Sequence, residues 1–126
     1  MDSTFDMENN KWKVSGIIIK DHVAAKKPIL TLSEVMEVSS NIGAGKVAYN
    51  MGAKTLYSYL KKFGFGIKTN VDFLGESGGI LREYTRWQPI DTAKAGYGYT
   101  VSVTGAQLVT AYSALANDGV LMQPHL

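Results

Sequence analysis

The chain of 126 residues contains no cysteine. This absence excludes disulfide bonds, a thiolate nucleophile and cysteine-ligated zinc sites together. It does not identify the compartment, because a chain without cysteine is compatible with either redox environment. Histidine is almost as scarce: only His22 and His125 are present, and no set of carboxylates accompanies them at a zinc-ligand spacing. We therefore expect no metal site and no cofactor.

A large charge of one sign and a long apolar run are also lacking. Thirteen basic residues against eleven acidic ones give a net charge of +2, which is too small for a dedicated nucleic-acid surface. No apolar run approaches the ~20 residues of a membrane span. Acidic residues at positions 2, 6 and 8 stand where a signal peptide would be basic. We expect no nucleic-acid partner, and any targeting or membrane segment is expected outside this chain.

Three glycine-containing patterns resemble nucleotide-binding loops and fail in detail. Gly43-Ala44-Gly45-Lys46 lacks the first glycine of a Walker loop, because position 40 is serine, and a valine follows the lysine. Gly64-Phe65-Gly66 and Gly96-Tyr97-Gly98 both lack the third glycine of a dinucleotide fingerprint. We interpret the two G-x-G pairs as turns or sites of close backbone packing.

Ser58-Tyr59-Leu60-Lys61 matches S-x-x-K, the nucleophile motif of one class of serine acyltransferases. In that motif the serine and lysine share a helix face, so that the amine can take the hydroxyl proton. Here Tyr59 and Leu60 fall on the apolar face of an expected amphipathic helix, which turns Ser58 and Lys61 toward solvent. We interpret this match as accidental. A nucleophile elbow, G-x-S-x-G, is absent from the sequence.

Short strands are expected toward both ends of the chain. Residues 5–20 read as extended, with a turn at 8–10 and a strand at 17–19, and residues 21–28 read as a loop. A last strand is expected to begin at Val120. Because both ends stop in apolar, strand-like sequence, we expect the chain to be a slice of a larger protein.

Helices are expected between the strands, which makes the chain mainly α with short β elements. Capping boxes at Thr31–Glu34 and Thr104–Gln107 mark two helix starts. Residues 64–79, rich in glycine, are expected to be irregular. The last helix carries one apolar face, formed by Leu108, Val109, Tyr112, Leu115 and Ala116. The expected helices are a short one after Thr31, those over 41–50, 53–63 and 89–95, and one after Thr104 that ends at 117–119.

Ser39-Ser40-Asn41 is the most informative pattern for function. Alone, S-x-N is a common helix-breaking turn, because serine and asparagine compete with the backbone for hydrogen bonds. Its context makes it specific, since it follows a capped helix and interrupts an apolar pattern. Further along the chain stand Arg86-Trp87, a glycine-rich stretch at 96–104 that ends in Val-Thr, and Ala-Tyr-Ser-Ala-Leu-Ala-Asn-Asp-Gly-Val at 111–120.

With these elements in this order, the chain from about residue 5 to 126 resembles the transpeptidase domain of class B penicillin-binding proteins, in particular the septal, cell-division type. The resemblance implies that residues 1–126 are part of one transpeptidase domain. They would form an incomplete helical subdomain of the penicillin-binding-protein/β-lactamase-like fold.

The resemblance also implies a chemistry. In that family the serine of S-x-x-K attacks the penultimate D-Ala of a peptidoglycan stem peptide, and the acyl group passes to an amine on a neighbouring strand. β-Lactams mimic D-Ala-D-Ala and trap the serine. Carried over to this sequence, Ser39 relays a proton, while Asn41 hydrogen-bonds the substrate amide and steadies the catalytic lysine. Ser40 fills the free middle position and receives no catalytic role.

Two family motifs are missing from the sequence. The true S-x-x-K should lie several dozen residues before Ser39, and K-[ST]-G should follow the last helix. Lys54-Thr55-Leu56 and Lys68-Thr69-Asn70 both fail at the third position of K-[ST]-G. We therefore expect the isolated chain to be inactive. The parent protein is expected at the extracytoplasmic face of the bacterial membrane, anchored by a segment not present here, with D-Ala-D-Ala stem peptides and β-lactams as its partners.

Excision from a larger domain would leave apolar side chains uncovered, each forfeiting ~1.5–3 kcal/mol of burial. We therefore expect the chain to self-associate. Two alternatives remain open at this point. A serine β-lactamase or β-lactam-sensor relative would share the fold and motif logic, and a non-catalytic helical interaction module would need none of the site residues.

Overall fold

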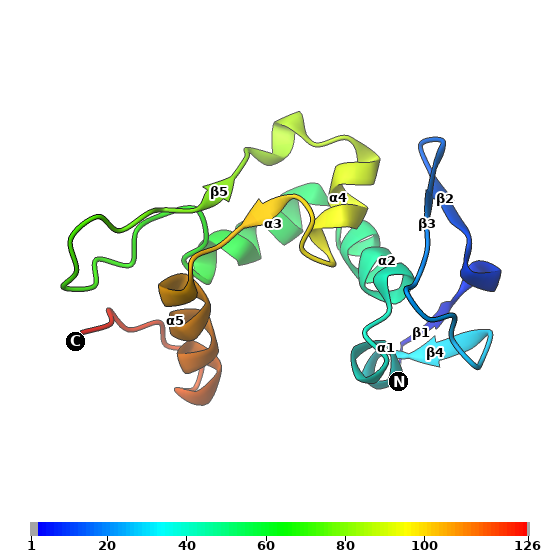
Figure 1. Cartoon of the computed structure of the whole chain (residues 1–126), viewed down its shortest axis with the longest axis horizontal. Helices are drawn as coiled ribbons and strands as arrows, with labels where there is room; N and C mark the ends of the chain where they lie inside the picture. The colour runs from blue at the N-terminus through cyan, green and yellow to red at the C-terminus, as the bar shows by residue number, and fades with distance from the viewer. Residues whose placement is uncertain (1–2, 126) are drawn as a thin grey trace. The chain divides into compact units, whose positions relative to one another are not determined.

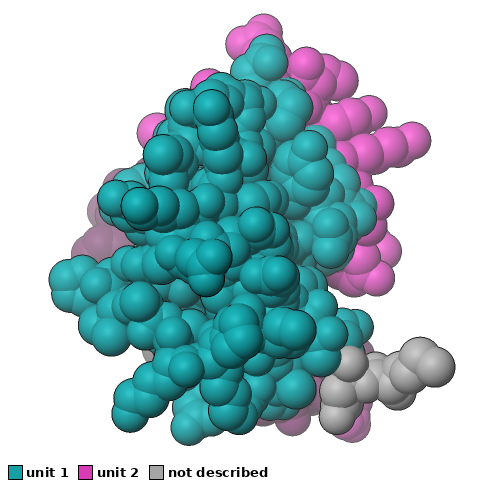
Figure 2. Space-filling view, turned by 90° about the vertical axis from the view of Figure 1, so that its right-hand side faces the viewer, with its two compact units in different colours: residues 1–53, 87–99 teal, residues 54–86, 100–126 magenta. Residues whose placement is uncertain are grey.

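The computed structural model describes residues 3–125, which gather into two compact units (Figures 1 and 2). Unit 1 combines residues 1–53 with 87–99, and unit 2 combines residues 54–86 with 100–126. Each unit is thus built from two separate stretches of the chain. No helix within residues 3–125 has the length and apolar character needed to span a membrane.

Unit 1 begins with two small antiparallel strand pairs. Strand β1 (Thr4–Asp6) pairs with β4 (Ile29–Thr31), and β2 (Trp12–Val14) pairs with β3 (Ile17–Ile19) as a tight hairpin (Figure 1). The 3₁₀ turn η1 (Glu8–Asn10) lies where a turn is predicted. The predicted strand at 17–19 is confirmed, whereas β4 is not predicted, because its three residues carry no alternation signal of their own.

The helices of unit 1 are α1 (Leu32–Glu37), α2 (Asn41–Met51) and α4 (Pro89–Ala95). Their bounds confirm the three helices predicted for this part of the sequence. Strands and helices share one core, so the short strands are held by packing against helices as well as by pairing. Its buried side chains are Met7, Val14, Ile19, Leu30, Val35, Ile42, Ile90 and Ala93.

Small residues allow α2 and α4 to approach closely. A Cβ on Gly96, directly after α4, would stand 2.7 Å from the Cβ of Ala48 on α2. A Cβ on Gly45 would stand 3.0 Å from the ring of Trp12. Both distances are shorter than an ordinary carbon–carbon contact. The absence of a Cβ at Gly96 therefore allows α4 to pack closely on α2, and its absence at Gly45 allows Trp12 of β2 to pack closely on α2.

Unit 2 contains α3 (Ala53–Lys62, all but its first residue), the paired strands β5 (Ile80–Leu81) and β6 (Val101–Ser102), the turn η2 (Tyr84–Arg86) and α5 (Gly105–Ala116). The two predicted helices are confirmed. The β5–β6 pair falls in sequence that carries no strand pattern, since each strand has only two residues.

Gln107 ties the first turn of α5 to the irregular segment before β5. Its side chain is 1% exposed, and its Nε2 donates to the carbonyl oxygens of Ile67 at 2.6 Å and Gly78 at 2.7 Å. Its Oε1 accepts from the backbone N–H of Thr104 at 2.9 Å. Thr104 Oγ1 in turn accepts from the Gln107 N–H, so the predicted capping box is confirmed.

The apolar face of α5 is exposed. Leu108, Val109, Tyr112 and Leu115 are 44–68% exposed, while the buried face of the helix consists of Gln107, Thr110, Ala111 and Ala114. The strand predicted from Val120 is wrong, because residues 120–122 are irregular and pair with no strand within residues 3–125. A strand needs a partner for its ladder, and local apolar character alone does not supply one.

Candidate functional site

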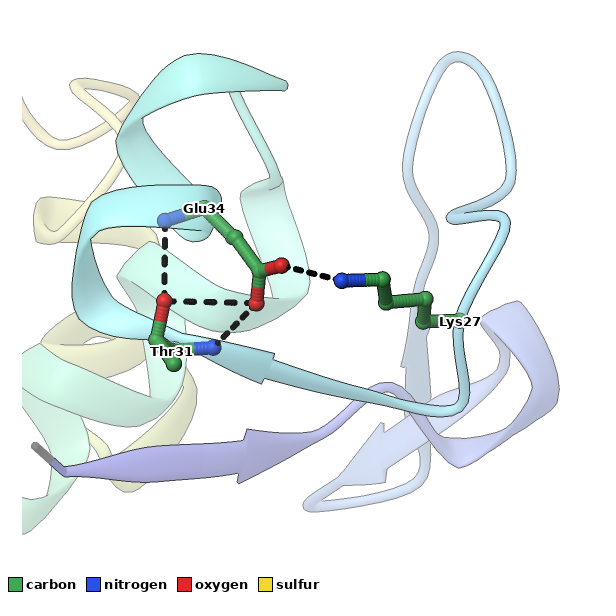
Figure 3. Close-up of polar contacts among 3 residues, drawn as sticks. All are labelled: Lys27, Thr31 and Glu34. Carbon is green, nitrogen blue, oxygen red and sulfur yellow. Dashed lines mark hydrogen bonds and ion pairs between the residues drawn. The ribbon is translucent and has the colours of Figure 1, made fainter.

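Helix α1 is only six residues long, so its position depends on how its ends are held. At its start, Thr31 Oγ1 accepts from the Glu34 N–H at 3.2 Å, and Glu34 Oε2 accepts from the Thr31 N–H at 2.9 Å (Figure 3). Lys27 Nζ lies 2.5 Å from the other carboxylate oxygen, Oε1. The predicted capping box is confirmed, and Lys27 adds a charged contact that the spacing alone does not predict.

At its other end, α1 closes in a Schellman motif. The N–H of Ser39 donates to the Met36 carbonyl at 3.2 Å, and the N–H of Ser40 donates to the Val35 carbonyl at 3.0 Å. This pair of bonds requires a left-handed residue just past the helix, a place usually taken by glycine. Ser39 occupies it with φ +53°.

Helix α3 ends in the same way and shows the usual solution. Gly64 donates to the Lys61 carbonyl at 2.9 Å, and Phe65 donates to the Leu60 carbonyl at 3.1 Å. Gly64 has φ +84°, a conformation that costs glycine little. A residue with a Cβ pays roughly 1–2 kcal/mol there. Serine at position 39 is therefore not the residue that backbone geometry would favour.

Ser40 is buried, 2% exposed, and begins α2. Its Oγ accepts from the Gly43 N–H at 2.9 Å and donates to Asp21 Oδ2 at 2.8 Å. The second Asp21 oxygen, Oδ1, accepts from the Ile42 N–H at 2.9 Å. Two of the N–H groups at the start of α2 are thus satisfied by side chains, and a carboxylate stands at the positive end of the helix.

Asn41 is the first residue of α2, and its side chain is half-buried. Its Nδ2 donates to the Lys20 carbonyl at 3.1 Å, which fixes the orientation of the amide. Ser39, on the other side of the buried Ser40, is exposed. Ser39 and Asn41 therefore lie in a turn whose backbone is fixed by the end of α1 on one side and by the start of α2 on the other.

The other candidate motifs do not form a site. Ser58 and Lys61 are both exposed on α3. His125 Nδ1 lies 3.5 Å from Asp72 Oδ2 in an exposed pair, and His22 is exposed in the loop after β3. Within the described part of the chain, no three His, Asp or Glu side chains group as metal ligands would.

Comparison with known proteins identifies the family. The family model described as "Penicillin binding protein transpeptidase domain" matches residues 1–126. The chain belongs to the penicillin-binding-protein transpeptidase family. It is 38% identical over 95 residues to the probable peptidoglycan D,D-transpeptidase PenA of Neisseria gonorrhoeae, covering 75% of this chain and 16% of PenA. It is 34% identical over 109 residues to the peptidoglycan D,D-transpeptidase FtsI of Escherichia coli, covering 86% of this chain and 18% of FtsI.

A solved structure of the transpeptidase family shows the same fold. The TP domain of penicillin-binding protein 3 from Burkholderia pseudomallei superposes with a TM-score of 0.91 at 34% identity, covering 98% of this chain and 37% of that one. The predicted fold class is thereby confirmed: short β elements with mainly α structure, forming part of the transpeptidase fold. The chain spans less than a fifth of the length of PenA and FtsI.

The sequence motif singles out Ser39 and Asn41, and the structure places both in the turn between α1 and α2. The motif misses Asp21, which lies in the loop between β3 and β4 that no motif marks. The only signal in the sequence is a lone acidic residue soon after the Ile-Ile-Ile run at 17–19. That signal does not predict which helix the Asp21 carboxylate contacts.

The contacts of Glu34 predict that the stability of unit 1 depends on pH. The hydrogen bond from Lys27, followed by that from the Thr31 N–H, lowers the pKa of Glu34 from 4.5 to about 2. A depressed folded-state pKa stabilises the fold fully above about pH 4.5, and this contribution is lost as the pH falls toward 2. We expect an NMR titration of the Glu34 carboxyl carbon to show its midpoint near pH 2.

Removing the lysine separates the two causes. Lys27→Met should raise the pKa of Glu34 while leaving it below 4.5, because the Thr31 N–H still donates. Lys26→Met, a change at the neighbouring exposed lysine, should leave the midpoint where it is. A wild-type midpoint at pH 4.5 would contradict the contacts in Figure 3.

Proposed function

We propose that the chain is the S-x-N-bearing segment of a class B, septal-type peptidoglycan D,D-transpeptidase, lying between the S-x-x-K and K-[ST]-G motifs of one domain. The observation that carries this proposal is the fixed turn at Ser39-Ser40-Asn41 in a chain that matches the transpeptidase family along its length. The backbone cost of a serine at φ +53° adds support, because a purely structural turn would be better served by glycine.

The roles of the two side chains follow from how they are held. Ser39 is exposed, so its hydroxyl can accept a proton and pass it on toward the amine that leaves with the terminal D-Ala. The bond from Asn41 Nδ2 to Lys20 leaves Oδ1 to accept from the ammonium of the catalytic lysine. The remaining Nδ2 hydrogen can donate to the substrate amide carbonyl. Both groups would then act on the acyl-enzyme step, which the nucleophilic serine performs.

The substrates and location of the parent protein belong to the same proposal. It would cross-link stem peptides that end in D-Ala-D-Ala and bind β-lactams at the nucleophilic serine of its S-x-x-K motif. It would work at the extracytoplasmic face of the membrane, held by an anchor outside this chain. The family match over residues 1–126 and the similarity to PenA and FtsI, which are both named as peptidoglycan D,D-transpeptidases, favour a transpeptidase over a β-lactamase, a sensor or a non-catalytic module.

A fluorescent penicillin tests the assignment. The product of the complete reading frame should be labelled covalently, and the isolated chain should not, because its sequence lacks the nucleophile and the K-[ST]-G strand. In the complete protein, Ser39→Ala should slow acylation by roughly 10²- to 10⁴-fold, the range of a lost proton-transfer group. Asn41→Ala should slow it by roughly 10²- to 10³-fold, the range of a lost hydrogen-bond donor at the reacting centre.

Matched controls come from the accidental motif on α3. Ser58→Ala and Lys61→Ala should leave the acylation rate unchanged. The proposal fails if the isolated chain is labelled, if the complete product is not, or if the Ser58 and Lys61 changes slow labelling more than those at 39 and 41.

We also propose that the isolated chain self-associates through uncovered apolar side chains, among them Val109, Tyr112 and Leu115 on the outer face of α5. Light scattering should give a mass above that of one chain, increasing with concentration. Val109→Glu should shift the mass toward a single chain, whereas Val23→Glu, at an exposed loop position of unit 1, should do so less. A constant single-chain mass over a wide concentration range would rule this out.

A further inference from the structure

Asp21 is a buried acidic residue to which the proposed mechanism gives no role. Asp21 is 8% exposed and lies in the loop that follows β3. Buried carboxylates need compensating hydrogen bonds, and both of those that the Asp21 carboxylate accepts come from the start of α2, from Ser40 and Ile42. Its own N–H donates to Asn10 Oδ1 at 2.7 Å, which fixes the loop from the other side.

The carboxylate spans the two residues that flank Asn41. Oδ2 accepts the hydroxyl of Ser40 at 2.8 Å, and Oδ1 accepts the N–H of Ile42 at 2.9 Å. The adjoining residue of the loop, Lys20, offers its carbonyl to the Asn41 side chain at 3.1 Å. One short stretch, Lys20-Asp21, therefore holds Asn41 by its backbone neighbours and by its amide.

Ser40 transmits this restraint to Ser39. Its N–H closes the Schellman motif on Val35, and its Oγ begins α2 through the Gly43 N–H at 2.9 Å. The Ser40 hydroxyl donates to Asp21 Oδ2 at 2.8 Å, and a weaker acceptor, Met7 Sδ, lies 3.5 Å away. Loss of the carboxylate would free the hydroxyl proton and leave the Ile42 N–H without its partner inside the protein.

We infer that Asp21 is a positioning residue of the acyl-transfer site: it orients Ser39 and Asn41 through Ser40, Ile42 and the Lys20 carbonyl. The inference rests on the function proposed above. Catalytic groups displaced by about 1 Å can lose on the order of 100-fold in rate, so a carboxylate that contacts no substrate can still control the reaction.

The test compares acylation by fluorescent penicillin in the complete protein for wild type, Asp21→Ala and Asp21→Asn. Asp21→Ala should slow acylation at least tenfold, and up to about 100-fold. Asp21→Asn should slow it at least threefold, because its amide can still accept from Ile42 but cannot accept the Ser40 hydroxyl. The milder variant keeps the test decisive if the alanine variant does not fold.

A matched control separates positioning from general loss of stability. Thr104→Ala removes the equivalent N-terminal cap of α5, which takes no part in the S-x-N turn. It should lower the unfolding temperature as the Asp21 variants do and leave the acylation rate within twofold of wild type. If the folded Asp21 variants acylate within twofold of wild type, or if Thr104→Ala slows acylation as much, the inference is overturned.

A second measurement does not depend on activity. In the 126-residue chain, NMR should show a shifted Ile42 backbone N–H and altered Asn41 side-chain amide resonances in Asp21→Asn, with the helical amides near Ala48 unchanged. Unaltered Asn41 and Ile42 resonances would overturn the positioning role. A wild-type protein that no penicillin acylates, with these resonances shifted as expected, would instead contradict the proposed function.

Discussion

One helix ends and another begins within three residues, and the candidate site depends on this constraint. Ser39 adopts the left-handed conformation that closes α1, and Ser40 both completes that closure and caps α2. Asn41 is already helical. A shift of Ser39 or Ser40 would break a hydrogen bond at a helix end, and a shift of Asn41 would break its bond to the Lys20 carbonyl. A three-residue motif thereby gains the rigidity that acid–base chemistry requires of its groups.

Packing in the core of unit 1 holds the two helices that flank this turn. Val35 on α1 and Ile42 on α2 are almost fully buried, and a Cβ on Gly43 would stand 2.6 Å from a Val35 methyl group. The two helices joined by the turn are therefore in direct contact. Close packing of α2 on α4 also fixes the position of α2. In this arrangement the apolar core decides where the helices lie, and a few hydrogen bonds decide where the site residues point.

Local signals were sufficient to predict much of this architecture. The two capping boxes each specify a helix start by chemistry within a few residues, and both are confirmed. What depends on distant partners was not predictable. Strand β4 forms because β1 lies beside it, and residues 120–122 stay irregular despite strand-like composition.

The site follows the same division. The S-x-N pattern and its place between two helices can be read from the sequence, because a serine–asparagine run interrupts an apolar periodicity. The left-handed Ser39 cannot, since helix ends of this type usually carry glycine. The carboxylate of Asp21 cannot either, because it reaches Ser40 and Ile42 across about 20 residues of chain. Each contact of this kind needs the folded core before it can form.

The relative stabilities of two variants test most directly whether Ser39 is held in the left-handed turn. In urea unfolding, Ser39→Gly should be more stable than Ser39→Ala by about 1 kcal/mol, because only glycine adopts φ +53° without a Cβ penalty. At Ser58, in the interior of α3, the order should reverse, with Ser58→Ala the more stable by about 1 kcal/mol. If alanine were the more stable residue at both positions, Ser39 would not be the left-handed joint between α1 and α2.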